Sequence, residues 1–475
     1  MAADTEKLDL VVIGSGPAGE KGAAQAAYFG KEVALVERGG TVGGACVHTG
    51  TLPSKTLREA ALYVTGFHRG ELYGMTLEID RQASLRQLMG RLRAVTDQQV
   101  AQIARNIDRH RIALHLRGAA EFVAPDEVVV RDPSGAEIRR LTADCFLIAT
   151  GSAPLRPAGV PFSDPDVEDS DTILDLDRIP TSLAVVGGGV VGCEYACTFA
   201  ALGTRITIIE GRGALMGFLD REMSTALKSA LERKGHDVLL GDAVTSVERV
   251  ASGPLRLQLK SGKVLDVDKV LYSAGRAGNT QGLGLDKANV ALDGKGRIRV
   301  DEHFRTSAPR IYAAGDVIGS PALASVSMEQ ARVAMCHAFD IPYKTRVSPI
   351  TPYGIFTIPE ISMVGATEEK LATAGAAFES GRARFENNAR GQIIGEHDGL
   401  IKLLFDPASR KLLGVHIIGE RATELIHIGQ MVMELGGTLD VFINSVFNFP
   451  TLSDVYKYAA YDGLQRLALG PARTL

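Results

Sequence analysis

The sequence predicts an α/β protein with two Rossmann-like dinucleotide-binding domains, the second inserted in the first, and a C-terminal α/β domain. Three observations predict it: a glycine fingerprint that occurs twice, an acid at the same distance behind each copy, and a C-terminal region without a fingerprint. At 475 residues, 45% apolar and 23% charged, the chain is long enough for several buried cores. We expect domain boundaries at 1–152 and 276–346 for the first domain, 153–275 for the second and 347–475 for the last.

The first fingerprint follows a short apolar strand near the N-terminus. Residues 9–13 form this strand, an alanine-rich helix follows the glycines, and the next strand, 32–36, ends at Glu37. The three glycines are Gly14, Gly16 and Gly19. The first permits a tight turn, the second lets the backbone approach a pyrophosphate, and the third lets helix and strand pack closely. Glu37 can accept hydrogen bonds from ribose hydroxyls, so this copy predicts a dinucleotide site.

The same pattern recurs in the middle of the chain. Strand 183–186 leads into the glycines, and strand 205–209 ends at Glu210. The glycines of this copy are Gly187, Gly189 and Gly192. One fingerprint is a weak indication because glycine turns are common, but two copies with matching strands and acids strongly indicate two nucleotide sites.

Two further glycine turns follow apolar strands. Strand 145–149 ends at Thr150-Gly151, and strand 310–314 ends at Gly315-Asp316. A carboxylate at the end of a strand can face a polyol chain, or it can cap the next helix; the sequence leaves both open. The segment 271–276, which contains Gly275, predicts a strand leaving the second unit. The chain therefore enters one nucleotide domain, passes through another and returns to complete the first.

The loop before Pro53 holds one cysteine where a redox pair would fit. A Cys-x4-Cys spacing puts two sulfurs one helical turn apart, but Cys46 is matched here by Thr51. A hydroxyl can neither form a disulfide nor relay two electrons. We interpret Cys193 and Cys197 as core thiols, and we expect no metal site because the cysteines lack zinc-ligand spacing. The protein is therefore expected to work without a dithiol.

Together these residues resemble the FAD-dependent pyridine nucleotide–disulfide oxidoreductases, over nearly the whole chain. The resemblance also includes Pro53-Ser54-Lys55, Gly275-Arg276 and the segment 450–453. It implies FAD at the first fingerprint, NAD or NADP at the second, and a homodimer formed by the last domain. The implied FAD-binding residues are Gly14, Gly16, Gly19, Glu37, Gly44, Cys46, Thr51, Lys55, Thr150, Gly151, Gly315 and Asp316. The implied NAD(P)-binding residues are Gly187, Gly189, Gly192, Glu210, Arg212 and Gly275.

Two departures from the disulfide enzymes of that family occur together. Thr51 replaces the second loop cysteine, and Phe449 replaces the histidine of a His-Pro-Thr-x-x-Glu segment. Phenylalanine cannot transfer a proton, so Asp454 has no imidazole to orient. Because both the dithiol and its proton-transferring base are missing, the protein is expected to pass electrons to an acceptor other than a disulfide. The combination is similar to the subgroup of this family that moves hydride between NADPH and NAD.

The resemblance implies that Lys55 lies beside the flavin and pairs with Glu194, and these two are the predicted catalytic residues. A cation there stabilises the negative charge of reduced flavin; the alternative is a lysine that merely faces solvent. Only two dinucleotide folds are predicted and FAD takes one. NADPH and NAD should therefore take turns at the other, which predicts ping-pong kinetics.

Nucleotide preference and one histidine stay open at the level of sequence. Glu210 suits the free 2′-hydroxyl of NAD and would repel the 2′-phosphate of NADP. Arg212 can pair with that phosphate, or it is an ordinary surface arginine beside a loop. His48 either contacts the flavin or is satisfied within its own loop.

The charge of the chain argues against nucleic acid and anionic membranes as partners. A net charge of -4 gives no basic footprint, so small-molecule nucleotides remain the expected ligands. The N-terminus has no signal-peptide pattern, and the apolar stretch 182–203 contains consecutive glycines and Glu194, which favours strand–turn–helix over a membrane span. We expect a cytoplasmic protein. Two competing hypotheses are an NAD(P)H:quinone or dye reductase on the same scaffold, and a non-catalytic flavoprotein subunit.

Overall fold

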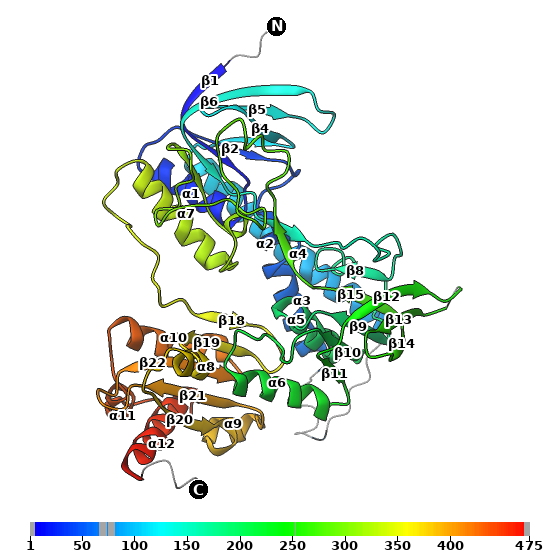
Figure 1. Cartoon of the computed structure of the whole chain (residues 1–475), viewed down its shortest axis with the longest axis vertical. Helices are drawn as coiled ribbons and strands as arrows, with labels where there is room; N and C mark the ends of the chain where they lie inside the picture. The colour runs from blue at the N-terminus through cyan, green and yellow to red at the C-terminus, as the bar shows by residue number, and fades with distance from the viewer. Residues whose placement is uncertain (1–4, 66–73, 75–80, 252, 470–475) are drawn as a thin grey trace. The chain divides into compact units, whose positions relative to one another are not determined.

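The computed structural model describes residues 5–65, 74, 81–251 and 253–469 (Figure 1). The chain divides into two compact units, and the boundary between them falls within the helices α3 (Thr51–Thr65) and α4 (Arg81–Arg109). The first unit comprises Met1–Thr56, Met89–Leu155 and Gly275–Ser348. The second comprises Leu57–Leu88, Arg156–Ala274 and Pro349–Leu475. The finer division into four parts stays a prediction.

A seven-stranded sheet forms the centre of the first unit, in the order β3-β2-β1-β6-β5-β4 with β17 paired to β6. The strands β3, β2, β1, β6 and β17 are parallel, whereas β5 and β4 extend the sheet in antiparallel fashion. Their bounds are β1 Thr5–Ile13, β2 Val33–Glu37, β3 Ala113–Leu116, β4 Ala119–Ala124, β5 Glu127–Arg131, β6 Glu137–Ile148 and β17 Ile311–Ala313.

Both faces of this sheet are covered, which explains why β1 and the end of β6 are continuous apolar runs. Leu10, Val12 and Leu147 pack on one side, where the helices α1 (Pro17–Tyr28) and α7 (Ala324–Ala338) lie side by side. Val11 and Phe146 point to the other side and join a second apolar cluster. The parallel strands thus end at one common edge.

The chain leaves and re-enters the first unit along two paired strands. β7 (Ser152–Pro154) and β16 (Arg276–Gly278) are antiparallel, and the Leu155 N–H donates to the Gly275 carbonyl at 3.0 Å. This arrangement is the one expected when a second nucleotide-binding unit is inserted into the first.

The second unit contains a five-stranded parallel sheet in the order β11-β10-β9-β15-β8. The segment expected as strand–turn–helix forms β9 and α5, in which Cys193 and Cys197 are buried core thiols as predicted. The bounds are β8 Val167–Asp169, β9 Ser182–Val186, β10 Arg205–Glu210, β11 Asp237–Leu240, β15 Lys269–Tyr272, α5 Val190–Ala201 and α6 Arg221–Arg233. A small antiparallel sheet flanks it, made of β12 Val244–Arg249, β13 Leu255–Leu259 and β14 Val264–Val267.

The C-terminal part of the second unit is built on a five-stranded antiparallel sheet, in the order β18-β19-β22-β21-β20. Helices α10 (Ala422–Glu434) and α12 (Val455–Leu469) cover one of its faces, and Ile401, Leu403 and Val415 point toward them. The strand bounds are β18 Tyr353–Ile355, β19 Ile361–Gly365, β20 Glu379–Arg384, β21 Leu400–Phe405 and β22 Leu412–Ile418. Shorter elements are α8 Glu368–Thr373, α9 Ala389–Ile394, α11 Asp440–Asn444, η3 Phe385–Asn387 and η4 Leu452–Asp454.

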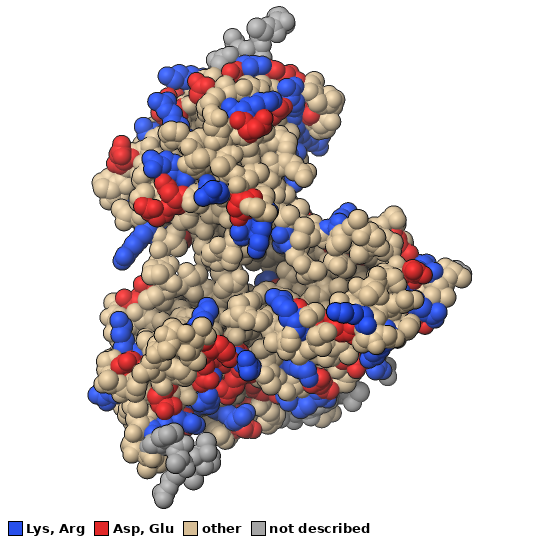
Figure 2. All heavy atoms as spheres, viewed as in Figure 1, with Lys and Arg blue, Asp and Glu red and all other residues tan. Residues whose placement is uncertain are grey.

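Charges of both signs are interspersed on the face drawn in Figure 2, in line with the small net charge of the chain. In the part of the chain that the structure describes, no helix is both long enough and apolar enough to cross a bilayer.

Candidate functional site: two dinucleotide turns and a single-cysteine loop

The residues predicted to bind FAD gather at one edge of the sheet of the first unit. Gly14 follows β1, Glu37 ends β2, Thr150 follows β6, and Gly315-Asp316 follows β17. Ligands of open α/β sheets bind beyond the carboxyl ends of parallel strands, because the turns there point backbone donors outward. The predicted NAD(P)-binding residues of the second unit also lie at the carboxyl ends of parallel strands, since Gly187 follows β9 and Glu210 ends β10.

The first and third glycines of each fingerprint are required by close backbone contacts. Gly14 has φ +101° and Gly187 has φ +111°, a region that only glycine adopts readily. A Cβ added at Gly19 would lie 1.8 Å from the Gly14 carbonyl oxygen, and one at Gly192 would lie 2.1 Å from the Gly187 carbonyl oxygen. In both copies, therefore, the helix rests directly on the turn.

The second glycine of each copy faces open space. A Cβ at Gly189 would meet nothing within 4 Å, and one at Gly16 would meet only the Gly44 Cα at 4.0 Å. Packing within the protein does not require glycine at these two positions, so the space beside the backbone is available to a ligand. A pyrophosphate fits it, because it lies at the N-terminus of α1 or α5, where unpaired N–H groups and the helix dipole favour anions.

Glu37 closes the first turn by hydrogen bonds that sequence reasoning missed. Its Oε2 accepts from the Ser15 N–H at 3.0 Å and the Ser15 hydroxyl at 2.7 Å, and its Oε1 accepts from the Gly39 N–H at 2.7 Å. The buried Ser15 hydroxyl also accepts from the Gly43 N–H at 3.1 Å. Ser15 thereby ties the fingerprint to the loop that carries Cys46. The only signal in the sequence was a hydroxyl at a variable position of the fingerprint.

Glu210 repeats this arrangement in the second unit, with one addition. Its Oε2 accepts from the Gly188 N–H at 2.8 Å and its Oε1 from the Arg212 N–H at 2.9 Å. The Arg212 guanidinium adds a two-point contact, Nε to Oε1 at 2.9 Å and Nη2 to Oε2 at 3.1 Å. Burial acts to raise the pKa of Glu210, but the hydrogen bonds from Arg212 and Gly188 outweigh it and hold that pKa below its usual value. The acid is thus charged and already paired with a cation.

Four of the predicted FAD-binding residues lie near one another at the single-cysteine loop: Cys46, Thr51, Lys55 and Asp316. Cys46 lies on α2 (Gly44–His48), and α3 begins at Thr51, whose side chain acts to lower the pKa of the Cys46 thiol. Burial raises the pKa of Cys46, and the charge of Asp316 acts in the same direction, whereas the Thr51 contact and the charge of Lys55 oppose it. The thiol is therefore protonated at neutral pH and a weak nucleophile. All five cysteines lie within the described residues and are free thiols.

Contacts in this unit bear on two open alternatives. His48 Nε2 lies 2.9 Å from the Val42 carbonyl and 3.1 Å from the Thr41 hydroxyl, so one ring nitrogen is satisfied within the loop, and a contact with the flavin stays a prediction. Asp316 accepts from the Ser152 hydroxyl at 2.7 Å and begins a single 3₁₀ turn, η2 (Asp316–Ile318), rather than a regular helix. A cap on a following α-helix is therefore wrong for Asp316.

The Thr150-Gly151 turn is fixed by Asn279, which sequence reasoning also missed. The Thr150 hydroxyl donates to the Asn279 carbonyl at 2.8 Å, and the Asn279 side-chain amide donates to the Thr150 carbonyl at 2.8 Å. Gly151, at φ +69°, accepts from the Asn279 N–H at 2.9 Å. Gly275 falls in the first unit, beside β16, whereas the other predicted NAD(P) residues lie in the second.

The sequence matches the pyridine nucleotide-disulphide oxidoreductase family over residues 8–331 and the dimerisation domain of that family over residues 351–460. The chain belongs to this family.

Relatives within the family include two bacterial proteins named soluble pyridine nucleotide transhydrogenase. The protein from Mycobacterium tuberculosis (strain ATCC 25177 / H37Ra) is 46% identical, over 97% of this chain and 98% of its own length. The protein from Pseudomonas putida (strain W619) is 42% identical over the same shares. Among solved structures, the Cu(II) complex of the HOCl-induced flavoprotein disulfide reductase RclA from Escherichia coli has a TM-score of 0.86 at 26% identity, over 96% of this chain and 99% of that chain. LpdA from Mycobacterium tuberculosis has a TM-score of 0.85 at 26% identity, over 95% and 99%.

In this member of the oxidoreductase family, the predicted catalytic pair is divided between the two units. Lys55 belongs to the first unit and Glu194 to the second, so their pairing stays a prediction. Glu194 is buried on α5, and its Oε1 accepts from the Phe356 N–H at 2.9 Å. The residue after Phe356 accepts from a second buried side chain. The Arg58 Nε and Nη2 donate to the Thr357 carbonyl at 3.2 and 3.1 Å. Arg58 lies one helical turn after Lys55 on α3, and its role in anchoring that helix had no signal in the sequence.

Proposed function

We propose that this protein is an FAD-dependent transhydrogenase that moves hydride between NADPH and NAD without a redox disulfide. The observation that carries the proposal is a loop with the single thiol of Cys46 and with Thr51 in the place of a second cysteine, in a chain with two complete nucleotide turns. A thiol and a hydroxyl cannot cycle between dithiol and disulfide, so hydride has no route to a disulfide substrate. The name of the two relatives, and the flavoprotein named among the structural neighbours, support this activity and its cofactors.

The first unit is the proposed FAD site. Bound FAD supplies the hydride chemistry, taking a hydride from one nucleotide and returning it to the other. The backbone at Gly16 leaves room for the pyrophosphate, and Glu37 has lone pairs that remain for ribose hydroxyls. Lys55, whose charge acts at Cys46, holds a positive charge on the side where the ring would lie and favours the reduced, anionic form.

The second unit is the proposed site for NADPH and NAD in turn. Gly189 leaves room for the pyrophosphate, between Gly187, which makes the turn, and Gly192, on which the helix packs. Both nucleotides have to use this turn, because the described residues offer one such turn beyond that of the flavin site. Glu210 accepts from the 2′-hydroxyl of NAD, and Arg212 leaves Glu210 to pair with the 2′-phosphate of NADP. Alternate occupancy predicts parallel initial-rate plots.

The last domain is the proposed dimer interface, in a cytoplasmic homodimer. Its family match is a dimerisation domain, and large apolar side chains are exposed throughout its C-terminal part. They are Met431, Leu435, Val441, Val446, Phe449, Tyr458, Tyr461 and Leu469. Such a concentration of exposed apolar groups is typical of a surface covered by another chain.

Stopped-flow absorbance tests the activity. NADPH is expected to bleach the flavin of the purified protein, and NAD, mixed in afterwards, is expected to restore its absorbance at a rate that accounts for turnover. Lipoamide and glutathione disulfide are expected to leave the reduced flavin unchanged. Reoxidation by quinones but not by NAD would overturn the proposal in favour of a quinone reductase, and failure of either nucleotide to bleach the flavin would favour a non-catalytic subunit.

A further inference from the structure

A row of polar side chains crosses the C-terminal sheet on the face opposite α10 and α12. His416 on β22 stands beside Lys402 on β21, which stands beside Arg382 on β20. Lys402 is 1% exposed, and His416 is fully buried. Burying an ammonium group is unfavourable unless carboxylates pair with it. The partners of Lys402 therefore identify the elements that this face of the sheet contacts.

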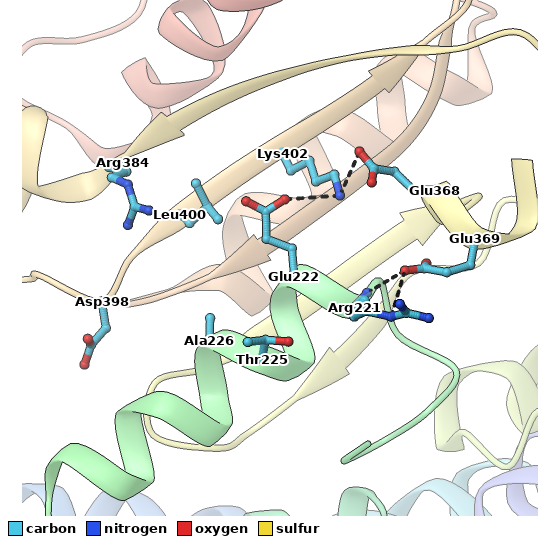
Figure 3. Close-up of a pocket in the computed structure, with 10 residues that line it drawn as sticks. All are labelled: Arg221, Glu222, Thr225, Ala226, Glu368, Glu369, Arg384, Asp398, Leu400 and Lys402. Carbon is cyan, nitrogen blue, oxygen red and sulfur yellow. Dashed lines mark hydrogen bonds and ion pairs between the residues drawn. The ribbon is translucent and has the colours of Figure 1, made fainter. Parts of the chain in front are cut away.

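The partners of Lys402 come from the first turns of two helices. Its Nζ lies 2.8 and 2.9 Å from the two carboxylate oxygens of Asp220, 3.2 Å from Glu222 and 3.1 Å from Glu368. Asp220 is the N-cap of α6, where its side chain accepts from the Glu222 N–H, and Glu368 opens α8. Figure 3 shows Glu222, Glu368 and Lys402 meeting between α6 and the sheet.

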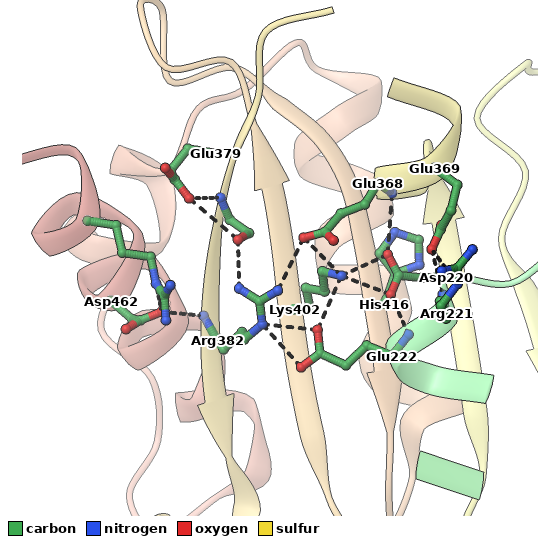
Figure 4. Close-up of polar contacts among 12 residues, drawn as sticks. Asp220, Arg221, Glu222, Glu368, Glu369, Glu379, Arg382, Lys402, His416 and Asp462 are labelled. Carbon is green, nitrogen blue, oxygen red and sulfur yellow. Dashed lines mark hydrogen bonds and ion pairs between the residues drawn. The ribbon is translucent and has the colours of Figure 1, made fainter. Parts of the chain in front are cut away.

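Arg382 completes the set from the next strand. Its Nε lies 3.0 Å from Glu222 and its Nη2 3.1 Å from Glu368, so two carboxylates are shared between two cations (Figure 4). We call Asp220, Glu222, Glu368, Arg382 and Lys402 the buried charge cluster. It fixes the N-terminal turn of α6, an element of the nucleotide-binding part of the second unit, to the C-terminal sheet.

The turn that the cluster fixes is continuous with the second nucleotide site. Residues 213–219 connect Arg212 to Asp220, and two hydrogen bonds hold the middle of this loop, at the adjacent residues Leu215 and Met216. The Ser224 hydroxyl on α6 donates to the Leu215 carbonyl at 2.5 Å. The Met216 N–H donates to the carbonyl of Gly188, whose own N–H donates to Glu210. A short hydrogen-bonded path thus runs from the cluster to the fingerprint turn.

We propose that Lys402 is a positioning residue for the second nucleotide site. Through Asp220 and the loop 213–219 it holds Arg212 and the turn at Gly188 in the geometry that binds the nucleotide, although the C-terminal sheet that carries it has no fingerprint. The inference rests on the proposed function of the second unit as the NADPH and NAD site. It assigns to the buried charge cluster a role in nucleotide affinity, beyond holding two parts of the unit together.

The test compares two equally buried lysines, Lys402→Met and Lys269→Met, in the full-length flavoprotein. Lys269 is also 1% exposed and paired with carboxylates, Asp166 at 3.0 Å and Glu168 at 3.2 Å, but it begins β15, at the end of the sheet away from the fingerprint. For Lys402→Met we expect KM for both NADPH and NADH to rise roughly 5- to 10-fold, the size of a typical coupling between sites, with kcat within about twofold. For Lys269→Met we expect a lower Tm with unchanged KM.

A milder pair of variants keeps the test decisive if Lys402→Met fails to fold. Ser224→Ala removes the bond from α6 to Leu215 but leaves the charges intact, and Thr225→Ala changes an exposed residue of the same turn. KM should rise for Ser224→Ala alone, with the flavin spectrum unchanged. Equal KM values in all four variants and the wild type would overturn the inference. If the wild type itself is not reduced by NADPH, the proposed function fails instead, so the two failures are distinguishable.

Discussion

The guanidinium of Arg212 spans both carboxylate oxygens of Glu210, at 2.9 and 3.1 Å. The first fingerprint has the same acid, Glu37, but Gly39 stands where Arg212 stands in the second, so the cation belongs to one copy only. The Arg212 side chain is 66% exposed, and exposed ion pairs contribute little to stability. Arg212 can therefore exchange its carboxylate for a phosphate at small cost.

Replacing Arg212 should separate the two nucleotides. For Arg212→Ala we expect KM for NADPH to rise about tenfold, because a charge-assisted contact to the 2′-phosphate is lost, while KM for NADH changes less than about twofold. Steady-state kinetics with each nucleotide measures the ratio. Arg205→Ala, another exposed arginine of the same unit, serves as the control. Equal effects of Arg212→Ala on both nucleotides would contradict the exchange.

Lys55→Met should slow the reductive half-reaction while FAD stays bound. The loss of a cation placed where negative charge develops costs about 10²-fold in rate when the site is shielded from water. Stopped-flow bleaching by NADPH measures this rate, and the flavin content checks binding. Lys31→Met, a surface lysine of the same unit, should react like the wild type. An unchanged bleaching rate in Lys55→Met would remove the assigned role.

Cys46 should prove dispensable. Burial raises the pKa of its thiol, so alkylation by iodoacetamide at pH 7 should be slow and should accelerate as the pH rises. Cys46→Ser should retain NADPH-to-NAD turnover within about twofold, since the hydride route uses no sulfur. A loss of turnover on the scale of a missing catalytic group, about 10³-fold, would show that the thiol takes part in the chemistry.

A charge at Val446 should disrupt the proposed homodimer. Val446 is 95% exposed in a segment rich in exposed apolar groups, so Val446→Asp would bury an unpaired carboxylate if a second copy covers it. Size-exclusion chromatography with light scattering should show a shift from dimer to monomer. Val264→Asp, 53% exposed on β14, should stay dimeric. A Val446→Asp dimer as stable as the wild type would place the interface elsewhere.

Stability should fall as the pH rises through the range set by Glu396. Burial, with the nearby charges of Asp398 and Glu420, raises the pKa of Glu396 to about 7. Between its ordinary pKa of 4.5 and about 7 the folded state binds more protons than the unfolded state, so each rise in pH in this window favours unfolding. Glu396→Gln, which stays neutral, should therefore raise Tm at pH 8 and leave it unchanged at pH 4, below the ordinary pKa. The exposed Glu386→Gln should change Tm at neither pH.

The sequence predicted those features that depend on contacts close along the chain. Both glycine turns, the strand–turn–helix at Ser182–Gly203 and the burial of Cys193 follow from local pattern and are present. The partners of Lys402 and Arg58 had no such signal, because residues far apart in the sequence meet only after the strands and loops have assembled. The C-terminal region was expected only as α/β, and the register that aligns His416, Lys402 and Arg382 is set by strand pairing that no fingerprint marks.

The pairing of β7 with β16 has a consequence for how such a protein arises. Leu155 and Gly275 are joined by one hydrogen bond, so the residues between them have their entry and exit points at the same place on the host. A replacement for this segment has to bring its two ends together at this pair of strands to continue the host fold. It also has to rebuild the contacts of Asp220 and Glu222 with Lys402, so an exchange of the segment requires matched changes in the C-terminal sheet.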